Sequence, residues 1–592
     1  MDSEIRANID GLISDFIKAG TTVEDPVSKL LITALVHQSQ KIRDEISDLP
    51  DKVMERMCTY FIPGNKLDAT PALCLVQVSA KCRKGMEPHS LTDGSSYSFR
   101  IDSKQTLSYF PLYRNYVIPV EGKYMLTSGF LSIGETRISL NLAKKGIVWV
   151  GFTIPTEVDT LECFSLYIKG TGGVLPKRIS TMNGATELSF AAADNMAEIR
   201  MMEPFDSQQA SPASLEVFSG WRNVISNSGD GKLIYITDSL KDRDTFKFKA
   251  FPKQFQQILE SGDLDRFKDN TLWLQLDFGD EYDVPTDMEI IPNVVPVVNI
   301  SVNTVNLTQS TPIARLTKGD GSYFLNVAET SLSDRRQGFS AMESEVVIRD
   351  FDSSCYDSAN LHRDVRRLYN RFVEDYHAFV DYHGLKDGEL VRSLRELVNR
   401  IGKSVMTLPE ARNRYDEGTY AMRNMDLIGQ TASVKVTYLT TFGRLGNIPK
   451  SGMLMENRKD AALEKDVKVV CHASGGEDKA SADMRYEMLR YYTLTADRLY
   501  TRMDIDAFLR LRLVREFGSE EMKRISYSIE VKGAGGPERL MRGLYIDLRF
   551  KDRKNYDRAL STGLDSALRQ SISDRSCISM PIIVRLTEQN NG

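Results

Sequence analysis

The sequence predicts a multidomain α+β protein, with N-terminal helices, two β-rich domains, a helical connector and a small C-terminal α+β domain. The spacing of apolar residues is helical over the first sixty residues, changes to a period of two from about 65 to 350, and becomes helical again near 360. The last segment mixes both periods. At roughly 100–200 residues per domain, the 592 residues suggest about three to five domains.

Residues 1–64 are predicted to form a helical region. Glu24 and Asp25 precede Pro26, a residue that fits a first helical turn because its missing N–H has no intrahelical partner there. An apolar stripe follows, and a third short helix after it ends near Pro63 and Gly64. An apolar stripe on a helix is more often part of an intramolecular core, and we nominate this one as a candidate surface for bundling with helices of another protein. Its members are Leu31, Leu35, Ile42 and Ile46.

Two β-rich domains are predicted at 65–210 and 211–350, with turn clusters between their strands. Most predicted strands alternate between apolar and polar residues. The run Leu73–Val78 is apolar at nearly every position, which indicates a strand buried on both faces.

A helical connector is predicted at 351–425, where Leu361, Val365, Leu368 and Phe372 lie on one face. The C-terminal domain is predicted at 426–592. It contains a helical stretch over about 481–516 that breaks near Thr501, followed by two alternating strands, a helix and a final strand. This α-β-β-α-β order suggests helices on one face of a sheet.

Composition argues against several classes of protein. The formal net charge is −5, and the basic residues are interspersed with acidic ones, so no cluster is suited to neutralising nucleic-acid phosphates. The seven cysteines are scattered and odd in number, as expected in a reducing compartment. We find no signal peptide and no run of about 18 apolar residues. These features predict a cytoplasmic protein without membrane insertion.

Motifs for catalysis or metal binding are weak throughout the sequence. The carboxylates between Asp277 and Asp287 lack EF-hand spacing and are best explained as a polar turn after a strand. Cys471 and His472 are adjacent on a predicted strand, so their side chains point to opposite faces. Gly533, Gly535 and Gly536 connect two strands and do not form a phosphate loop. We therefore predict no enzyme activity, and no catalytic, cofactor-binding or metal-binding residue.

Three segments resemble the TssF family. The first is Asp25-Pro26 with Lys29-Leu30-Leu31 and the helix to Ile42-Arg43. The second is the helix from Leu49 to Tyr60, then Pro63 and the stretch from Ala69 to Gln77. The third and most specific is Val295-Pro296-Val297-Val298-Asn299, followed by Thr311-Pro312-Ile313. Together they cover about residues 20–330. Farther on, Leu494–Phe508 is similar to a segment of J-type phage baseplate wedge proteins.

The resemblance implies a structural subunit of the baseplate wedge of a bacterial type VI secretion system. Such subunits pair with a TssG-like subunit, usually two copies to one, and recruit TssK-like and TssE-like partners around a spike hub. The wedges template assembly of the tail tube and the contractile sheath. The resemblance also implies a baseplate docked at the inner face of the cell envelope, with no cofactor and no nucleic acid.

Two alternatives stay open. One is a wedge subunit of a related particle, either a phage tail or an extracellular contractile injection device. The other is a carbohydrate-binding or carbohydrate-active protein that uses the β-domains and the Asp277–Asp287 carboxylates.

Overall fold

The structure is a computed structural model of the full chain. The residues it describes are 57–58, 60–62, 67–81, 89–91, 95–103, 105–112, 115–120, 122–134, 136–141, 145–154, 164–181, 187–192, 231–236, 251–267, 271–317, 321–332, 335–337, 346–351, scattered positions between 371 and 403, 418–423, 433–533 and 542–588. Contacts divide the chain into two compact units, Met1–Asp68 with Ala480–Gly592, and Ala69–Lys479. The predicted multidomain α+β class is confirmed, with strands in the majority. The bounds of the five predicted domains stay predictions.

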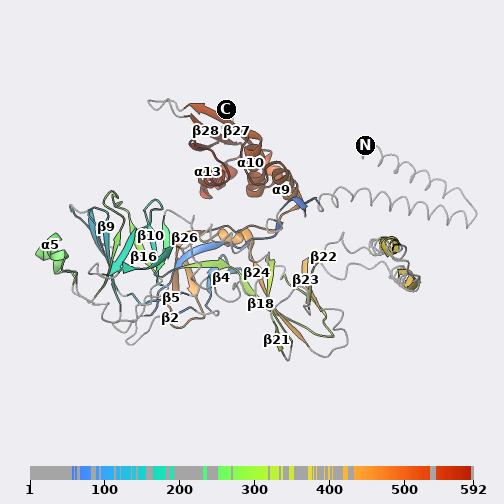
Figure 1. The fold of residues 1–592 in the computed structure, drawn as a ribbon, viewed down its shortest axis with the longest axis horizontal. Helices are drawn as coiled ribbons and strands as arrows, with labels where there is room; N and C mark the ends of the chain where they lie inside the picture. The colour runs from blue at the N-terminus through green and yellow to red at the C-terminus, as the bar shows by residue number, and fades with distance from the viewer. Residues whose placement is uncertain are drawn as a thin grey trace, which may run out of the picture. The chain divides into compact units, whose positions relative to one another are not determined.

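A closed six-stranded barrel lies at the centre of the Ala69–Lys479 unit (Figure 1). Each strand pairs antiparallel with its two neighbours. The barrel draws on strands that are some four hundred positions apart in the sequence, so it cannot form from any one segment of the chain. In order around the barrel, the strands are β1 (Leu73–Gln77), β17 (Val294–Asn299), β4 (Thr106–Pro111), β3 (Tyr97–Arg100), β25 (Leu454–Asn457) and β26 (Asp466–Ser474).

Strand β1 is buried on both faces, as its unbroken apolar run predicts. Cys74 and Val76 belong to the cluster that fills the barrel, together with Tyr97 and Val295. Leu73 and Leu75 belong to the cluster on the outer wall. An alternating strand would have presented one of these faces to water, so the continuous apolar run identifies a strand between two cores.

The outer wall packs against a β-sandwich. Its first sheet has the order β13 (Phe190–Ala192), β14 (Lys232–Ile236), β10 (Phe164–Lys169) and β16 (Glu289–Pro292). Its second has the order β12 (Glu187–Leu188), β11 (Arg178–Thr181), β15 (Leu272–Asp277), β9 (Ile147–Thr153), β6 (Gly122–Leu126), β7 (Phe130–Ile133) and β8 (Thr136–Ser139). Alternate residues of β10 face opposite ways: Leu166 and Ile168 join the sandwich core, and Tyr167 joins the barrel wall.

Two short helices, α5 (Phe255–Ile258) and α6 (Ser261–Leu264), supply cover for the other face of the seven-stranded sheet. Phe255 packs edge-on against both tryptophans of this face, with ring centroids 5.8 Å from Trp149 and 5.0 Å from Trp273. Gly151 lies beneath, and a Cβ there would meet a ring carbon of Trp273 at 2.9 Å. The sheet therefore requires glycine at this position.

A second, smaller sandwich continues directly from the barrel. One sheet has the order β18 (Ser301–Leu307), β24 (Val434–Thr441), β20 (Tyr323–Leu332) and β21 (Arg335–Gln337). The other has the order β19 (Ile313–Arg315), β23 (Gly418–Arg423) and β22 (Val346–Phe351). Strand β23 lies within the predicted connector and was not anticipated. The connector residues Leu361, Val365, Leu368 and Phe372 lie outside the described residues, whereas the scattered described positions from 371 to 403 are helical. A further short pair joins β2 (His89–Ser90) and β5 (Tyr116–Val117).

The other unit confirms the predicted α-β-β-α-β order (Figure 1). Strand β28 pairs antiparallel with β27 and parallel with β29, and the parallel pair requires the crossover that two helices provide. The elements are α9 (Ala482–Thr495), α10 (Arg502–Phe517), α11 (Ser519–Met522), β27 (Ile525–Gly533), β28 (Arg542–Phe550), α12 (Arg553–Ser561), α13 (Leu564–Arg575) and β29 (Ile582–Glu588).

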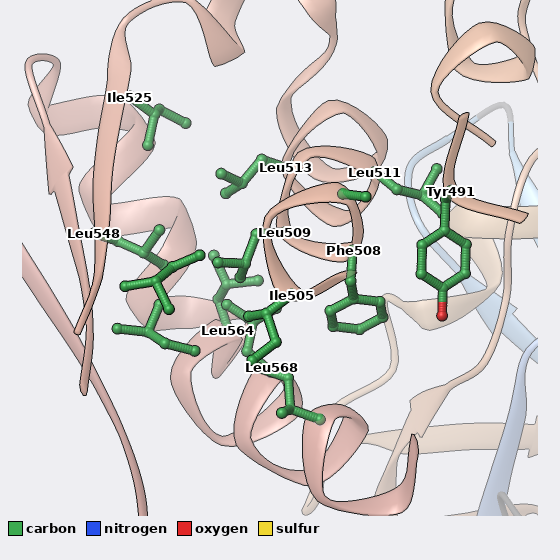
Figure 2. Close-up of a cluster of buried hydrophobic side chains, with 14 of the residues drawn as sticks. Tyr491, Ile505, Phe508, Leu509, Leu511, Leu513, Ile525, Leu548, Leu564 and Leu568 are labelled. Atoms are coloured by element: carbon green, nitrogen blue, oxygen red, sulfur yellow. The ribbon is translucent and has the colours of Figure 1, made fainter. Parts of the chain in front are cut away.

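One apolar core holds this unit together (Figure 2). Ile505 and Leu509 of α10 lie beside Leu564 and Leu568 of α13, and Leu548 approaches from the sheet. Helical positions four apart share a face, so α10 presents one stripe to the sheet and α13. Cys58 and Ile62 from the N-terminal segment belong to the same core.

The predicted break near Thr501 is confirmed. Ala496 and Asp497 adopt positive φ, 46° and 61°, which ends α9. Helix α10 then begins with a capping box: the Thr501 hydroxyl accepts a hydrogen bond from the Asp504 amide, and the Asp504 carboxylate accepts one from the Thr501 amide.

We predict that Leu509→Ala destabilises the Met1–Asp68 and Ala480–Gly592 unit. Leu509 is fully buried in the core, and truncating a buried leucine costs about 2–5 kcal/mol. Native-state hydrogen exchange of the β28 amides is the measurement, because a chain with two compact units need not unfold in one step. Leu560→Ala is the matched control, since Leu560 is 53% exposed on α12. Equal effects of the two substitutions would contradict the prediction.

Candidate functional site: the Asn299 junction and nearby exposed side chains

The chain crosses twice between the barrel and the second sandwich, and both crossings meet at Asn299. The first runs from β17 into β18 through Asn299 and Ile300. The second runs from β24 through Phe442 into the 3-10 helix η3 (Gly443–Asn447), which leads on to barrel strand β25. We call Asn299, Thr441, Phe442 and η3 the Asn299 junction.

Asn299 is fully buried, and both its side-chain amide and its backbone form hydrogen bonds. Its Nδ2 donates to the carbonyl oxygen of Ser108 at 3.0 Å, and its backbone N–H donates to Ala72 O at 2.7 Å. Its Oδ1 accepts from the amide of Phe442 at 3.1 Å. The Thr441 hydroxyl donates to Asn299 O at 2.8 Å. One side chain therefore joins β4 and both crossings, and it satisfies buried backbone groups that water cannot reach.

Glycines allow the chain to pack this tightly. A Cβ on Gly446 would meet Asn299 Oδ1 at 2.7 Å and the Cβ of Ala72 at 2.8 Å. Gly443 has φ +52°, in the left-handed region that glycine adopts without strain. Because Gly446 has no Cβ, η3 packs directly against Asn299 and Ala72.

Further hydrogen bonds fix η3 from outside the junction. The Tyr109 hydroxyl donates to Gly446 O at 2.6 Å, and burial raises the pKa of Tyr109 well above its ordinary value, so the hydroxyl stays a donor. Asn447 and Gly476 exchange two hydrogen bonds of 2.8 and 2.9 Å. The Arg444 amide donates to Asp478 Oδ1 at 2.9 Å.

Exposed apolar side chains lie in η3 and in the chain that follows it. Leu445 lies in η3, and Met453 and Leu454 follow in the chain that enters β25; all three are exposed. A second exposed set lies in the other unit, along α9 and at its connection to α10, and consists of Tyr486, Leu494, Tyr500 and Met503. Exposed apolar residues on a well-held backbone suit protein–protein contact better than chemistry.

Sequence reasoning located none of these exposed residues. It predicted 481–516 as a helical stretch with a break near Thr501, and an apolar side chain at helical spacing is ordinarily assigned to the core. The nominated interface residues Leu31, Leu35, Ile42 and Ile46 lie outside the described residues, so their role stays a prediction. A usable signal was present in Val295–Asn299, the most specific part of the family resemblance, because it contains Asn299 itself.

The sequence motifs considered for catalysis or metal binding form turns, an ion pair and strand pairs. Asp277 ends β15, and its Oδ1 accepts a hydrogen bond from the Gly279 amide at 2.8 Å, which confirms a polar turn. Asp283 forms an exposed ion pair with Lys145 at 3.2 Å. Cys471 is buried and His472 is exposed, so the two point to opposite faces of β26, as predicted. Strands β27 and β28 pair antiparallel up to Gly533 and Arg542, as a hairpin requires.

Within the described residues, no group of three or more His, Cys, Asp or Glu side chains is arranged to hold a metal ion. None of the helices in that same part of the chain combines the length and apolar character needed to cross a bilayer.

Comparison with known proteins gives structural matches only. No family model matches the sequence, and no curated protein matches it. A chain of the type VI secretion system TssK-TssF-TssG baseplate subcomplex aligns with a TM-score of 0.40 and 12% identity, over 95% of this chain and 96% of that one. A chain of the type VI secretion system baseplate complex aligns with a TM-score of 0.35 and 12% identity, over 96% and 91%.

A third match is a chain of the anti-feeding prophage baseplate, with a TM-score of 0.26 and 10% identity, over 97% of this chain and 70% of that one.

We predict that Asn299→Ala and Asn299→Asp both destabilise the barrel. Alanine leaves the buried Phe442 amide without its acceptor, and each buried group left unpaired costs about 1–3 kcal/mol. Aspartate keeps the shape but places a carboxylate oxygen against the carbonyl of Ser108. Chemical denaturation, together with hydrogen exchange at the Phe442 amide, measures both effects.

The matched control for this prediction is Asn306→Ala. Asn306 is an exposed residue of β18, and surface substitutions of this kind change stability by about 0.5 kcal/mol or less. Wild-type exchange protection in Asn299→Ala would show that the junction does not depend on this side chain.

Proposed function

We propose that this chain is a structural subunit of a type VI secretion baseplate wedge, assembling with a TssG-like partner around the spike hub. In this role it makes and breaks no bond. Its β-domains hold neighbouring proteins in a ring that templates the tail tube and the contractile sheath.

One observation carries the proposal: two of the segments that resemble the TssF family are neighbours in the fold. The stretch that ends at Gln77 forms β1, and Val294–Asn299 forms β17. They pair antiparallel from Leu73 opposite Val298 to Gln77 opposite Val294, although more than two hundred residues separate them. The family-like segments thus build one shared element, the barrel wall that ends at Asn299.

The distribution of exposed apolar residues supports a role in assembly. Such residues occur in both compact units, on the barrel side at Leu454 and on the helical side at Tyr500. A subunit of a ring must contact more than one neighbour, and obligate interfaces of this kind bury some 2,000–5,000 Å² or more.

We assign the TssG-like contact to the apolar stripe of Leu31, Leu35, Ile42 and Ile46. Four apolar side chains at helical spacing can interdigitate with partner helices in a bundle. Two copies of this chain would bind one TssG-like subunit, and the resulting wedge would recruit TssK-like and TssE-like subunits at the cytoplasmic face of the cell envelope.

We predict that the double substitution Leu35→Asp and Ile42→Asp abolishes co-purification with the TssG-like subunit. Two buried, unpaired carboxylates in an apolar bundle each carry a desolvation cost of several kcal/mol. The matched control is Gln40→Asp with Lys41→Asp, which adds charge to the same stretch away from the stripe. Circular dichroism of both full-length variants tests folding, and normal complex formation by a folded double mutant would reject the assignment.

We predict that affinity purification of the full chain from its native cell recovers TssG-like and TssK-like subunits, identified by mass spectrometry. The reason is that obligate interfaces survive purification. Recovery of a membrane-anchoring complex together with these partners supports type VI secretion. Capsid or tail-fibre proteins in their place would assign the chain to a phage tail or an extracellular injection particle.

A further inference from the structure

We propose that the connection between α9 and α10 is a docking surface for an amphipathic helix of another protein, one that carries carboxylates beside its apolar stripe. This inference rests on the contacts of the connection itself and goes beyond the proposed function. We call the surface formed by Tyr486, Leu494, Tyr500 and Met503, with Arg498 and Arg502, the connection surface.

The apolar part of the connection surface is unusually open. Tyr500 is 69% exposed and Met503 is 71% exposed, and they lie on either side of the first residue of α10. Tyr486 and Leu494 are each more than half exposed on α9. They are eight residues apart and therefore share a face of that helix, about 12 Å from one another along its axis. Tyrosine, methionine and arginine are enriched in the centres of protein interfaces.

The backbone under these side chains is firmly held. Leu499 is fully buried, and its amide donates to Arg575 O at 2.9 Å. Asp497 Oδ1 accepts hydrogen bonds from the Tyr491 hydroxyl at 2.8 Å and from Arg575 Nε at 3.0 Å. Because the connection is pinned on both sides of Arg498, a partner would meet a preformed surface and would not have to order a loop.

The charges of the connection surface are asymmetric. Its carboxylates are used internally: Asp497 holds Arg575, and Asp504 accepts from the amides of Tyr500 and Thr501 at 3.0 and 2.8 Å. Arg498 and Arg502 are exposed, and no carboxylate of the described residues lies within ion-pair distance of either guanidinium.

Asp506, four residues after Arg502 on α10, also accepts hydrogen bonds through both of its carboxylate oxygens. Its Oδ1 accepts from the Tyr527 hydroxyl at 2.7 Å and its Oδ2 from Arg510 Nε at 3.0 Å. Burial, followed by this hydrogen bond, raises the pKa of Tyr527 to about 12, so the tyrosine remains a donor. Arg502 contributes to a lowered pKa at exposed Glu530, after the larger effect of Lys532. Arg498 and Arg502 therefore present two positive charges at the exposed side of the connection.

Positive charge beside exposed apolar side chains favours a partner helix that carries carboxylates next to an apolar stripe. A helix with an apolar stripe and flanking Asp or Glu would cover Tyr500 and Met503 and pair with both arginines. A second copy of this chain is a poorer fit, because a two-fold contact would bring two identical surfaces together, each carrying Arg498 and Arg502.

The test is photo-crosslinking from position 500. The full chain, with Tyr500 replaced by p-benzoylphenylalanine, is expressed in its native cell, irradiated, and the linked residue is identified by mass spectrometry. We expect a link to a helix of another protein with more Asp and Glu than Lys and Arg beside its apolar positions. The same chain carrying Arg498→Glu and Arg502→Glu should give roughly a tenfold lower yield, because the charges would then repel.

The control carries Arg553→Glu and Lys554→Glu, an exposed basic pair at the start of α12. Its yield should stay within about twofold of the unmodified chain, as expected for distant and independent sites. Circular dichroism verifies the fold of each variant. No link, a link within this chain or to a second copy, a link to a basic segment, or an unchanged yield after the arginine reversal would each overturn the proposal.

Discussion

The amide side chain of Asn299 is the interaction on which the larger unit depends. It donates to the carbonyl of Ser108 and accepts from the amide of Phe442, so a single buried group satisfies backbone atoms from β4 and from the second crossing. In a dry interior a hydrogen bond is stronger than in water, and an unpaired group is correspondingly costly. This constraint explains why Gly446 must lie against it, since any larger residue would collide with Oδ1.

The barrel that the junction closes is built from distant segments. Strand β1 pairs with β17 on one side and with β26 on the other, and it contributes to both the barrel interior and the outer wall. An arrangement of this kind must bring the ends of long loops together before any contact stabilises it. The buried apolar run in β1 supplies the hydrophobic free energy that offsets this entropic cost.

In the smaller unit, contacts between residues close in sequence set where the helices begin and end. Its helix boundaries are set by left-handed Ala496 and Asp497 and by the capping box at Thr501. Most of its core comes from elements that are close in sequence, and Cys58 and Ile62 join it from the N-terminal segment. At the end of α9 and the start of α10, the carboxylates of Asp497 and Asp504 accept hydrogen bonds from groups of the same unit. These contacts leave Tyr500, Met503 and two arginines on the outside, so the local structure of the turn determines the character of its surface.

The sequence alone determined those features that depend on neighbours in the chain. The two-faced burial of Leu73–Gln77, the break before Arg502, the opposite faces of Cys471 and His472 and the order of elements after Ala480 all follow from periodicity and capping. Only the tertiary structure decided that β1 lies between β17 and β26, that Asn299 joins two crossings, and that Tyr500 and Met503 face outward. Strand pairing and the buried or exposed state of an apolar residue depend on contacts between distant segments, and no local pattern encodes which segments will meet.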